Sequence, residues 1–135
     1  MPSKTFVGQY TSLAAIADFI AKAAQEAGFN SKDTYAVKLA VDEACSNIIE
    51  HGYQEQKGSK IRCSYVILKK GLKITIQDWG KPFEPGDIPD PDFNVSLFDL
   101  GPRGAGLYFM KNLMDEIKWD FESGDGNILT MVKHN

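Results

Sequence analysis

The stretch that decides the fold is EACSNIIEHGY, at residues 43–53. Glu43 and Asn47 are four residues apart, so on a helix their side chains lie on one face, about one turn from each other. The amide oxygen of Asn47 is a hard ligand that suits Mg²⁺. The carboxylate of Glu43 can accept a proton from an attacking hydroxyl. We therefore predict Glu43 as the catalytic base and Asn47 as the metal ligand.

The helix that carries this pair is predicted from a cap at Asn30 or Ser31 to about Glu50. Its apolar stripe is formed by Val37, Val41, Ala44 and Ile48. Glu43 and Asn47 lie on the arc beside this stripe, where a carboxylate is costly unless it has a function. Partial burial there would raise the pKa of Glu43 toward a useful range. The alternatives are a solvated or metal-orienting Glu43 and an Asn47 that only packs.

The segments on either side of this helix are also patterned. Residues 5–9 are predicted to be extended, and Thr11 or Ser12 is predicted to cap a helix that Gly28 ends. Residues 60–68 and 72–77 alternate and predict a hairpin with Leu72, Ile74 and Ile76 pointing inward.

Asp78 continues the inward parity of the second hairpin strand. Its carboxylate would then lie on the helix-covered face of the sheet, where it can accept a hydrogen bond from the exocyclic amine of a base. Gly80 leaves space for that base beside the backbone. The alternative for Asp78 is an ordinary turn residue.

A third segment, Arg103-Gly104-Ala105-Gly106-Leu107, opens a helix predicted to reach about Met114. Glycines at a helix start let backbone N–H groups approach a phosphate, and Arg103 could clamp the γ-phosphate. Residues 81–103 hold five prolines and lack periodicity, which predicts either a lid over a nucleotide or a disordered segment.

The last predicted elements are strands over residues 116–121 and 128–133, joined by a turn. Strands and helices occur in blocks rather than in strict alternation. This order predicts an α+β fold, a two-layer α/β sandwich.

In this order, the three segments resemble the GHKL superfamily of ATPases and kinases, whose nucleotide site uses an N box, a G1 box and a G2 box. The N box corresponds to residues 43–53, the G1 box to residues 78–83 and the G2 box to residues 103–107. The resemblance implies a histidine-kinase-like ATP-binding domain of the Bergerat type, with a mostly antiparallel sheet and helices on one face. It also implies ATP and Mg²⁺ as cofactors. The residues expected to bind the nucleotide are Asn47, Asp78, Gly80, Arg103, Gly104, Ala105, Gly106 and Leu107.

Within the superfamily, the His-Gly-Tyr end of the N box and the arginine before the G2 glycines are most similar to bacterial anti-sigma-factor serine/threonine kinases. This resemblance implies a kinase that phosphorylates a STAS-domain anti-anti-sigma protein and sequesters a sigma factor or similar effector. It also implies a homodimer, for which the N-terminal strand and first helix are the candidate interface. The chain departs from the family at Gly126-Asn127, where a Gly-Thr pair is common. The resemblance therefore does not decide whether the last strand forms a hydrogen bond to adenine.

Other classes of function are possible for the same pattern. One is an ATP-binding module that sequesters a partner with little or no turnover. A histidine kinase catalytic domain is disfavoured because no helical phosphoacceptor segment precedes Thr5. A fourth class is a structural α+β protein that binds no nucleotide.

Length and composition set further bounds. A chain of 135 residues is expected to form one domain, residues 1–135, and its net charge of −3 disfavours direct binding to nucleic acid. Without an apolar leader or a run of about 18 apolar residues, we expect a cytoplasmic protein with no membrane partner. Cys45 and Cys63 lack the spacing of a zinc site, and we expect both to be reduced packing residues.

Overall fold

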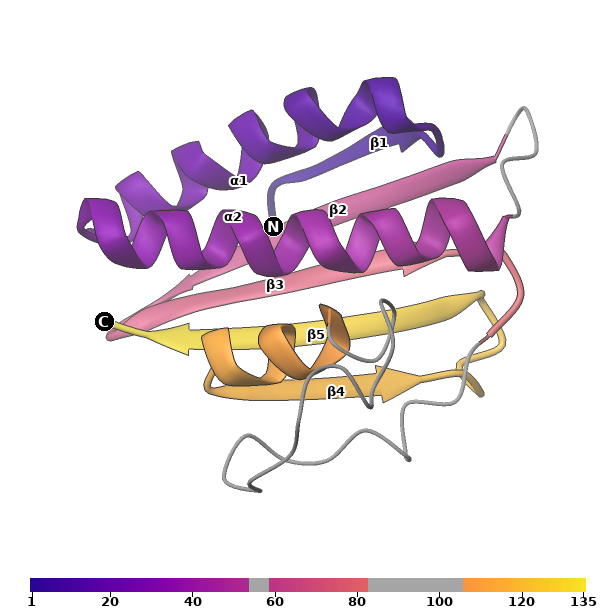
Figure 1. The fold of residues 1–135 in the computed structure, drawn as a ribbon. Helices are drawn as coiled ribbons and strands as arrows, with labels where there is room; N and C mark the ends of the chain where they lie inside the picture. The colour runs from indigo at the N-terminus through magenta and orange to yellow at the C-terminus, as the bar shows by residue number, and fades with distance from the viewer. Residues whose placement is uncertain (54–58, 83–105) are drawn as a thin grey trace.

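The computed structural model describes residues 1–53, 59–82 and 106–135 and is shown in Figure 1. Its strands form one sheet in the order β1-β2-β3-β5-β4, and every neighbouring pair is antiparallel. The strands are β1 (Ser3–Val7), β2 (Lys60–Leu68), β3 (Gly71–Asp78), β4 (Glu116–Asp120) and β5 (Asn127–His134).

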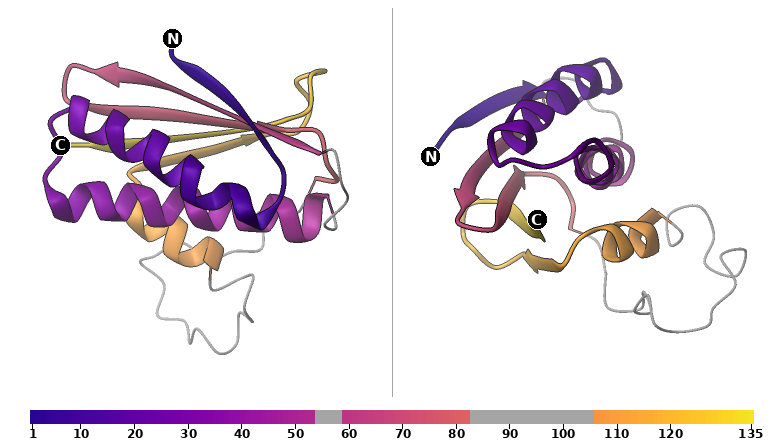
Figure 2. Two further views of the ribbon diagram at one scale, coloured as in Figure 1. Left: turned by 90° about the horizontal axis from the view of Figure 1, so that it is seen from above. Right: turned by 90° about the vertical axis from the view of Figure 1, so that its left-hand side faces the viewer.

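The helices are α1 (Leu13–Glu26), α2 (Ser31–Asn47), a short 3₁₀ turn η1 (Tyr10–Ser12), a π-helical turn η2 (Ile48–Gly52) and a helix over residues 106–113. The two views of Figure 2 show that these helices cover one face of the sheet. The predicted α+β sandwich, with an antiparallel sheet and helices on one face, is therefore confirmed.

The core lies between the two layers. Its completely buried members include Ile16 and Ile20 of α1, Val37 and Val41 of α2, and Ile74 of β3. Each of these side chains contributes roughly 1.5–3 kcal/mol by leaving water. The apolar stripe of α2 and the inward-facing side of β3, both predicted from the sequence, are thus the two surfaces that meet.

Local signals explain most helix ends. The Asn30 side chain accepts a hydrogen bond from the backbone N–H of Asp33 at 2.8 Å, so the predicted cap of α2 is confirmed. Gly28 ends α1 in the left-handed region, with φ of 84°. Ser12, one of the two positions predicted to cap α1, is its N-cap residue, but its side chain makes no capping hydrogen bond. The 3₁₀ turn begins the helix instead, because the N–H of Leu13 already donates to Tyr10.

The end of α2 differs from the uniform helix predicted to Glu50. The α-helix stops at Asn47 and widens into the π-helical turn η2, in which the N–H of Tyr53 donates to the carbonyl of Ile48 at 2.8 Å. The Gly52 carbonyl that this turn presents accepts from the N–H of Lys81 at 2.8 Å. A Cβ on Gly80 would lie only 2.6 Å from Gly52. The wider turn therefore places the end of the N box directly against the G1 box.

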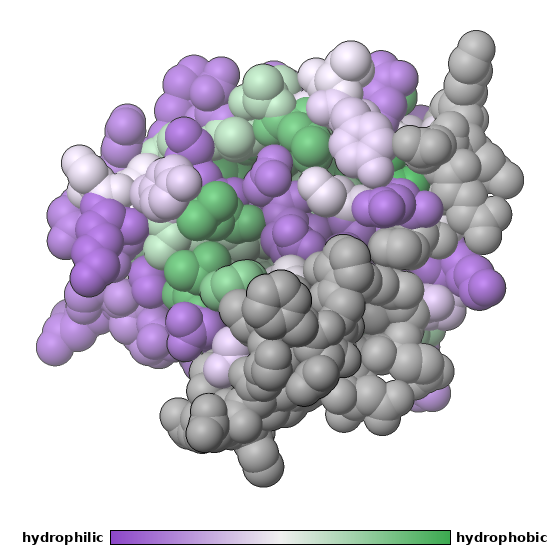
Figure 3. All heavy atoms as spheres, in the orientation of Figure 1, coloured by the Kyte–Doolittle hydropathy of each residue, from purple (hydrophilic) through white to green (hydrophobic). Residues whose placement is uncertain are grey.

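Figure 3 shows a largely hydrophilic surface with apolar side chains gathered where α2 passes the helix over residues 106–113. Cys45 and Cys63 are both buried free thiols, as expected for packing residues. In the described part of the chain, no helix combines the length and apolar character needed to span a bilayer.

Candidate functional site

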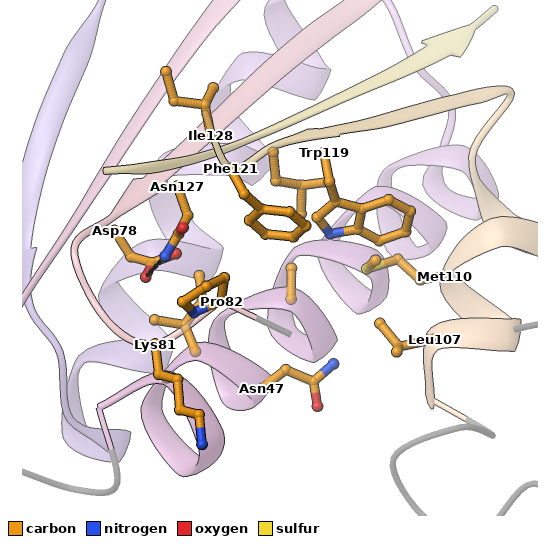
Figure 4. A pocket seen from close by; sticks show the side chains of 14 residues that line it. Asn47, Asp78, Lys81, Pro82, Leu107, Met110, Trp119, Phe121, Asn127 and Ile128 are labelled. Carbon is orange, nitrogen blue, oxygen red and sulfur yellow. Dashed lines mark hydrogen bonds between the residues drawn. The ribbon is translucent and has the colours of Figure 1, made fainter. Parts of the chain in front are cut away.

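A pocket lies between α2, the end of β3, the helix over residues 106–113 and the β4–β5 hairpin (Figure 4). The empty space among its lining residues amounts to about 440 Å³ and is continuous with solvent. Its walls contain Asn47, Asp78 and Leu107, one residue from each of the three predicted boxes. The fold thus brings together segments that are far apart in the sequence.

Asp78 is the last residue of β3 and is only 6% exposed, so the burial predicted from its parity is confirmed. Its Oδ1 accepts hydrogen bonds from the N–H of Gly80 at 2.9 Å and from Nδ2 of Asn127 at 3.0 Å. Burial raises the pKa of the Asp78 carboxyl, and these two hydrogen bonds oppose that rise. Neither bond engages Oδ2.

Asn127, the first residue of β5, is the partner that sequence reasoning missed. It faces Asp78 directly in the strand register and is 8% exposed. Its amide nitrogen also donates to the carbonyl of Gly80 at 2.9 Å, so one side chain holds Asp78 and Gly80, two residues of the G1 box. Figure 4 shows Asn127 beside Asp78. The signal for this role in the sequence was Asn127 itself, which follows Gly126 where the resembling family commonly has Thr.

Tyr53 supports the same strand end from the other side. Its buried hydroxyl accepts from the backbone N–H of Trp79 at 2.8 Å and donates to the carbonyl of Lys60. Burial is the main reason that the pKa of Tyr53 is raised. The tyrosine that closes the N box therefore fixes the chain immediately after Asp78.

Replacing Tyr53 with phenylalanine removes this hydroxyl and leaves the part-buried N–H of Trp79 and carbonyl of Lys60 without their hydrogen-bond partner. We expect the free energy of unfolding to fall by roughly 1–3 kcal/mol, the cost of leaving such groups unsatisfied. Urea denaturation followed by circular dichroism measures the change. Tyr35→Phe on the exposed face of α2 is the matched control, and equal stability losses in the two variants would contradict the role of the Tyr53 hydroxyl.

Asn47 is 5% exposed, and its Nδ2 has no hydrogen-bond partner among the described residues. Figure 4 shows its amide across the pocket from Asp78. An unpartnered buried donor fits a hydrogen bond to an acceptor atom of a bound ligand. The described residues contain no cluster of three His, Cys, Asp or Glu that could hold a metal, so protein carboxylates there do not form a site of their own.

Glu43 is half-buried on α2, one turn before Asn47. Burial raises the pKa of its carboxyl, and the negative charges of Asp42 and Glu50 raise it further. The carboxyl group does not line the pocket itself but packs against Gly106, the neighbour of the pocket residue Leu107. The partial burial predicted for Glu43 is confirmed.

The remaining walls of the pocket are mostly apolar, which suits a flat base. They include Met110, Trp119, Phe121 and Ile128, and Lys81 adds an exposed cation at the rim. Sequence reasoning had not assigned these five residues to the site. Arg103, Gly104, Ala105 and residues 83–103 of the predicted lid lie outside the described residues.

The comparison with known families gives a direct match. Residues 6–133 match the model of the histidine kinase-like ATPase domain. The chain belongs to this family. Family membership implies ATP as the ligand, in agreement with the resemblance drawn from the three boxes.

Curated relatives of this histidine kinase-like ATPase domain include serine-protein kinases. The chain is 29% identical to the serine-protein kinase RsbW of Bacillus velezensis, with 82% of this chain and 71% of the relative covered. It is 31% identical to the serine-protein kinase RsbW of Bacillus licheniformis, with 75% of this chain and 66% of the relative covered. The chain thus spans about two thirds of the length of these relatives.

A solved structure shares the fold. The crystal structure of RsbU and RsbW domains from Mycobacterium tuberculosis matches 99% of this chain with a TM-score of 0.62 and 15% sequence identity. The match covers 32% of that longer chain, and at this identity it supports the architecture of the ATPase domain alone.

Proposed function

We propose that this chain binds ATP with Mg²⁺ and transfers the γ-phosphoryl group to a serine or threonine hydroxyl of a protein partner. The observation that carries the proposal is the pocket itself. In it, the buried carboxylate of Asp78 lies across from Asn47, whose buried Nδ2 has no hydrogen-bond partner among the described residues, and Glu43 lies one turn before Asn47 on α2. Relatives named serine-protein kinases support it.

Asp78 is the proposed acceptor for the exocyclic amine of adenine. The bonds from Gly80 and Asn127 both end on Oδ1, and they fix the orientation of the carboxylate. This leaves Oδ2 free of both bonds and suited to a donor on the base. The apolar walls exclude water from this hydrogen bond and so strengthen it.

Asn47 is the proposed protein ligand to Mg²⁺ through its Oδ1. Magnesium is commonly bound by one or two protein groups together with substrate phosphates, so a single amide oxygen is a sufficient protein ligand. When bound, the ion would neutralise charge on the triphosphate. Gly104, Ala105 and Leu107 of the G2 box are proposed to contact the phosphates, and Arg103 to contact the nucleotide or the partner.

Glu43 is the proposed base. As the hydroxyl oxygen of the partner forms its bond to the γ-phosphorus, the bond from that phosphorus to the bridging oxygen of ADP breaks. The hydroxyl proton passes to the Glu43 carboxylate. A raised pKa makes this carboxylate a better proton acceptor than an ordinary surface glutamate.

The proposed partners follow from the family resemblance. They are a STAS-domain anti-anti-sigma protein, which would be phosphorylated, and a sigma factor or similar effector, which would be sequestered in the cytoplasm. We also propose a homodimer through β1 and α1, since β1 lies at one edge of the sheet.

A transfer assay tests the function. The purified chain is incubated with γ-labelled ATP, Mg²⁺ and a STAS-domain protein encoded beside its gene, and the labelled products are separated by size. We expect label on the STAS protein. ATP binding without any phosphoprotein would instead indicate a sequestering module, and no binding at millimolar ATP would indicate a structural protein.

Asn47→Leu tests the metal role with a side chain of similar size. We expect ATP affinity to lose its dependence on Mg²⁺, which calorimetry measures with and without the ion. Because an unsatisfied buried amide costs about 1–3 kcal/mol, we also expect the variant to unfold at higher denaturant concentration than the wild type.

The matched control is Asn112→Leu, at an exposed position of the helix over residues 106–113. It should leave both the Mg²⁺ dependence and the pocket unchanged. A Mg²⁺ response in Asn47→Leu equal to that of the control would remove Asn47 from the metal site.

A further inference from the structure

Gly106, the first described residue of the helix over residues 106–113, packs directly against the side chain of Glu43 on α2. A Cβ built on Gly106 would overlap Oε1 and Cδ of the Glu43 carboxyl group and would lie 3.1 Å from its Cγ. The carboxyl group thus occupies the space that any side chain at position 106 would need.

The helix over residues 106–113 is held at its C-terminal end. Nζ of Lys133 donates to the carbonyl of Leu113 at 2.9 Å, and the N–H of His134 donates to Oδ2 of Asp115 at 2.7 Å. Leu107 and Met110 are buried in the core. Moving this helix to admit a methyl group would disturb that packing, at a cost of about 1–3 kcal/mol.

The Glu43 side chain is the more movable partner in this contact. It is half-buried, and turning one of its χ angles by about 30° away from a rotamer costs about 0.5–1.5 kcal/mol, less than the cost of shifting the helix. A methyl group at position 106 would therefore turn the carboxylate away and leave the two helices in place.

We propose that Gly106 is a positioning residue for Glu43: its missing side chain leaves the space in which the carboxylate is held at the start of this helix. The expected effect of this contact on catalysis rests on the proposed function. The positioning role differs from the role predicted for Gly106 by sequence, in which the glycine lets the backbone approach a phosphate. The two roles make different predictions for the same variants.

Gly106→Ala is expected to lower kcat by about 10- to 100-fold, since small displacements of a reacting group have effects of that size. The affinity for ATP should change by less than about threefold, because no hydrogen bond to nucleotide is removed. In a Glu43→Ala background the same change should lower kcat no further. An additional loss in that background, or a loss of ATP affinity that matches the loss of rate, would overturn the proposal.

Nuclear magnetic resonance tests the contact without any turnover. In the isotopically labelled, nucleotide-free protein, Glu43→Ala should shift the amide resonance of Gly106. Gly106→Ala should shift the side-chain carboxyl resonance of Glu43 more than those of the other glutamates. Asn112→Ala, on the same helix, is the control and should leave the Glu43 resonance in place.

These two readouts separate the two proposals. An unchanged Glu43 resonance in Gly106→Ala overturns the positioning role even if the wild type transfers phosphate. If each substitution shifts the resonance of the other residue but the wild type labels no partner, the contact is supported and the kinase function is not.

Discussion

Asp78→Asn is expected to weaken ATP binding by about 10- to 100-fold, which corresponds to the loss of a hydrogen bond to a charged group. The amide oxygen can still accept from Gly80 and Asn127, so the local structure should be retained. The amide nitrogen, however, would present hydrogen atoms to the amine of adenine. Calorimetry with ATP measures the loss, and Asp18→Asn on the exposed face of α1 is the control for the change of charge.

The same variant should be more stable than the wild type without nucleotide. Burial holds the pKa of the folded Asp78 carboxyl above its ordinary value of 3.8, so its ionised form opposes folding. This penalty is absent well below pH 3.8, grows as the pH rises from there to the raised pKa, and is fully present above it. Asp78→Asn should therefore match the wild type in acid and exceed it at neutral pH. Weaker ATP binding joined to lower stability at neutral pH would point to a damaged fold rather than a lost base contact.

Glu43→Gln is expected to lower the rate of phosphoryl transfer by about 10²- to 10⁴-fold, the usual contribution of a general base. The amide keeps the size of the side chain but cannot take up the proton. ATP affinity should stay close to that of the wild type, because Glu43 does not line the pocket. Single-turnover transfer of labelled phosphate measures the rate, and Glu26→Gln on α1 is the matched control.

The pH dependence of transfer gives a second test of the base. Glu43 must be ionised to accept a proton, and its pKa lies above the ordinary 4.5. The acidic limb of the rate profile should therefore lie above that value, and Asp42→Asn should move it to lower pH by removing a neighbouring negative charge. A wild-type limb that Asp42→Asn leaves in place would assign the titration to another group.

Much of the fold and of the candidate site could be predicted from local sequence patterns. The strand period alone predicted that Asp78 is buried, and the helix period placed Glu43 and Asn47 beside the apolar stripe of α2. These inferences needed only residues within one element. The positions of the three boxes then followed from their resemblance to a known family.

The supporting contacts could not be predicted in the same way, because they join distant elements. Asn127 reaches Asp78 only through the pairing of β3 with β5, and no sequence period encodes that register. The π-helical turn at Ile48–Gly52 depends on where Gly52 meets Lys81. Likewise, the closeness of Glu43 and Gly106 arises from the packing of two helices far apart along the chain.

Both tryptophans of this chain belong to the region around Asp78. Trp119 lines the pocket wall, and Trp79 follows Asp78 and is fixed by Tyr53 through its backbone and by Asp125 through its indole nitrogen. Tryptophan dominates the ultraviolet emission of a protein that contains it. The unlabelled chain therefore carries one intrinsic fluorophore in the wall of the proposed nucleotide pocket and a second beside Asp78, and their emission can report the arrival of a ligand in real time.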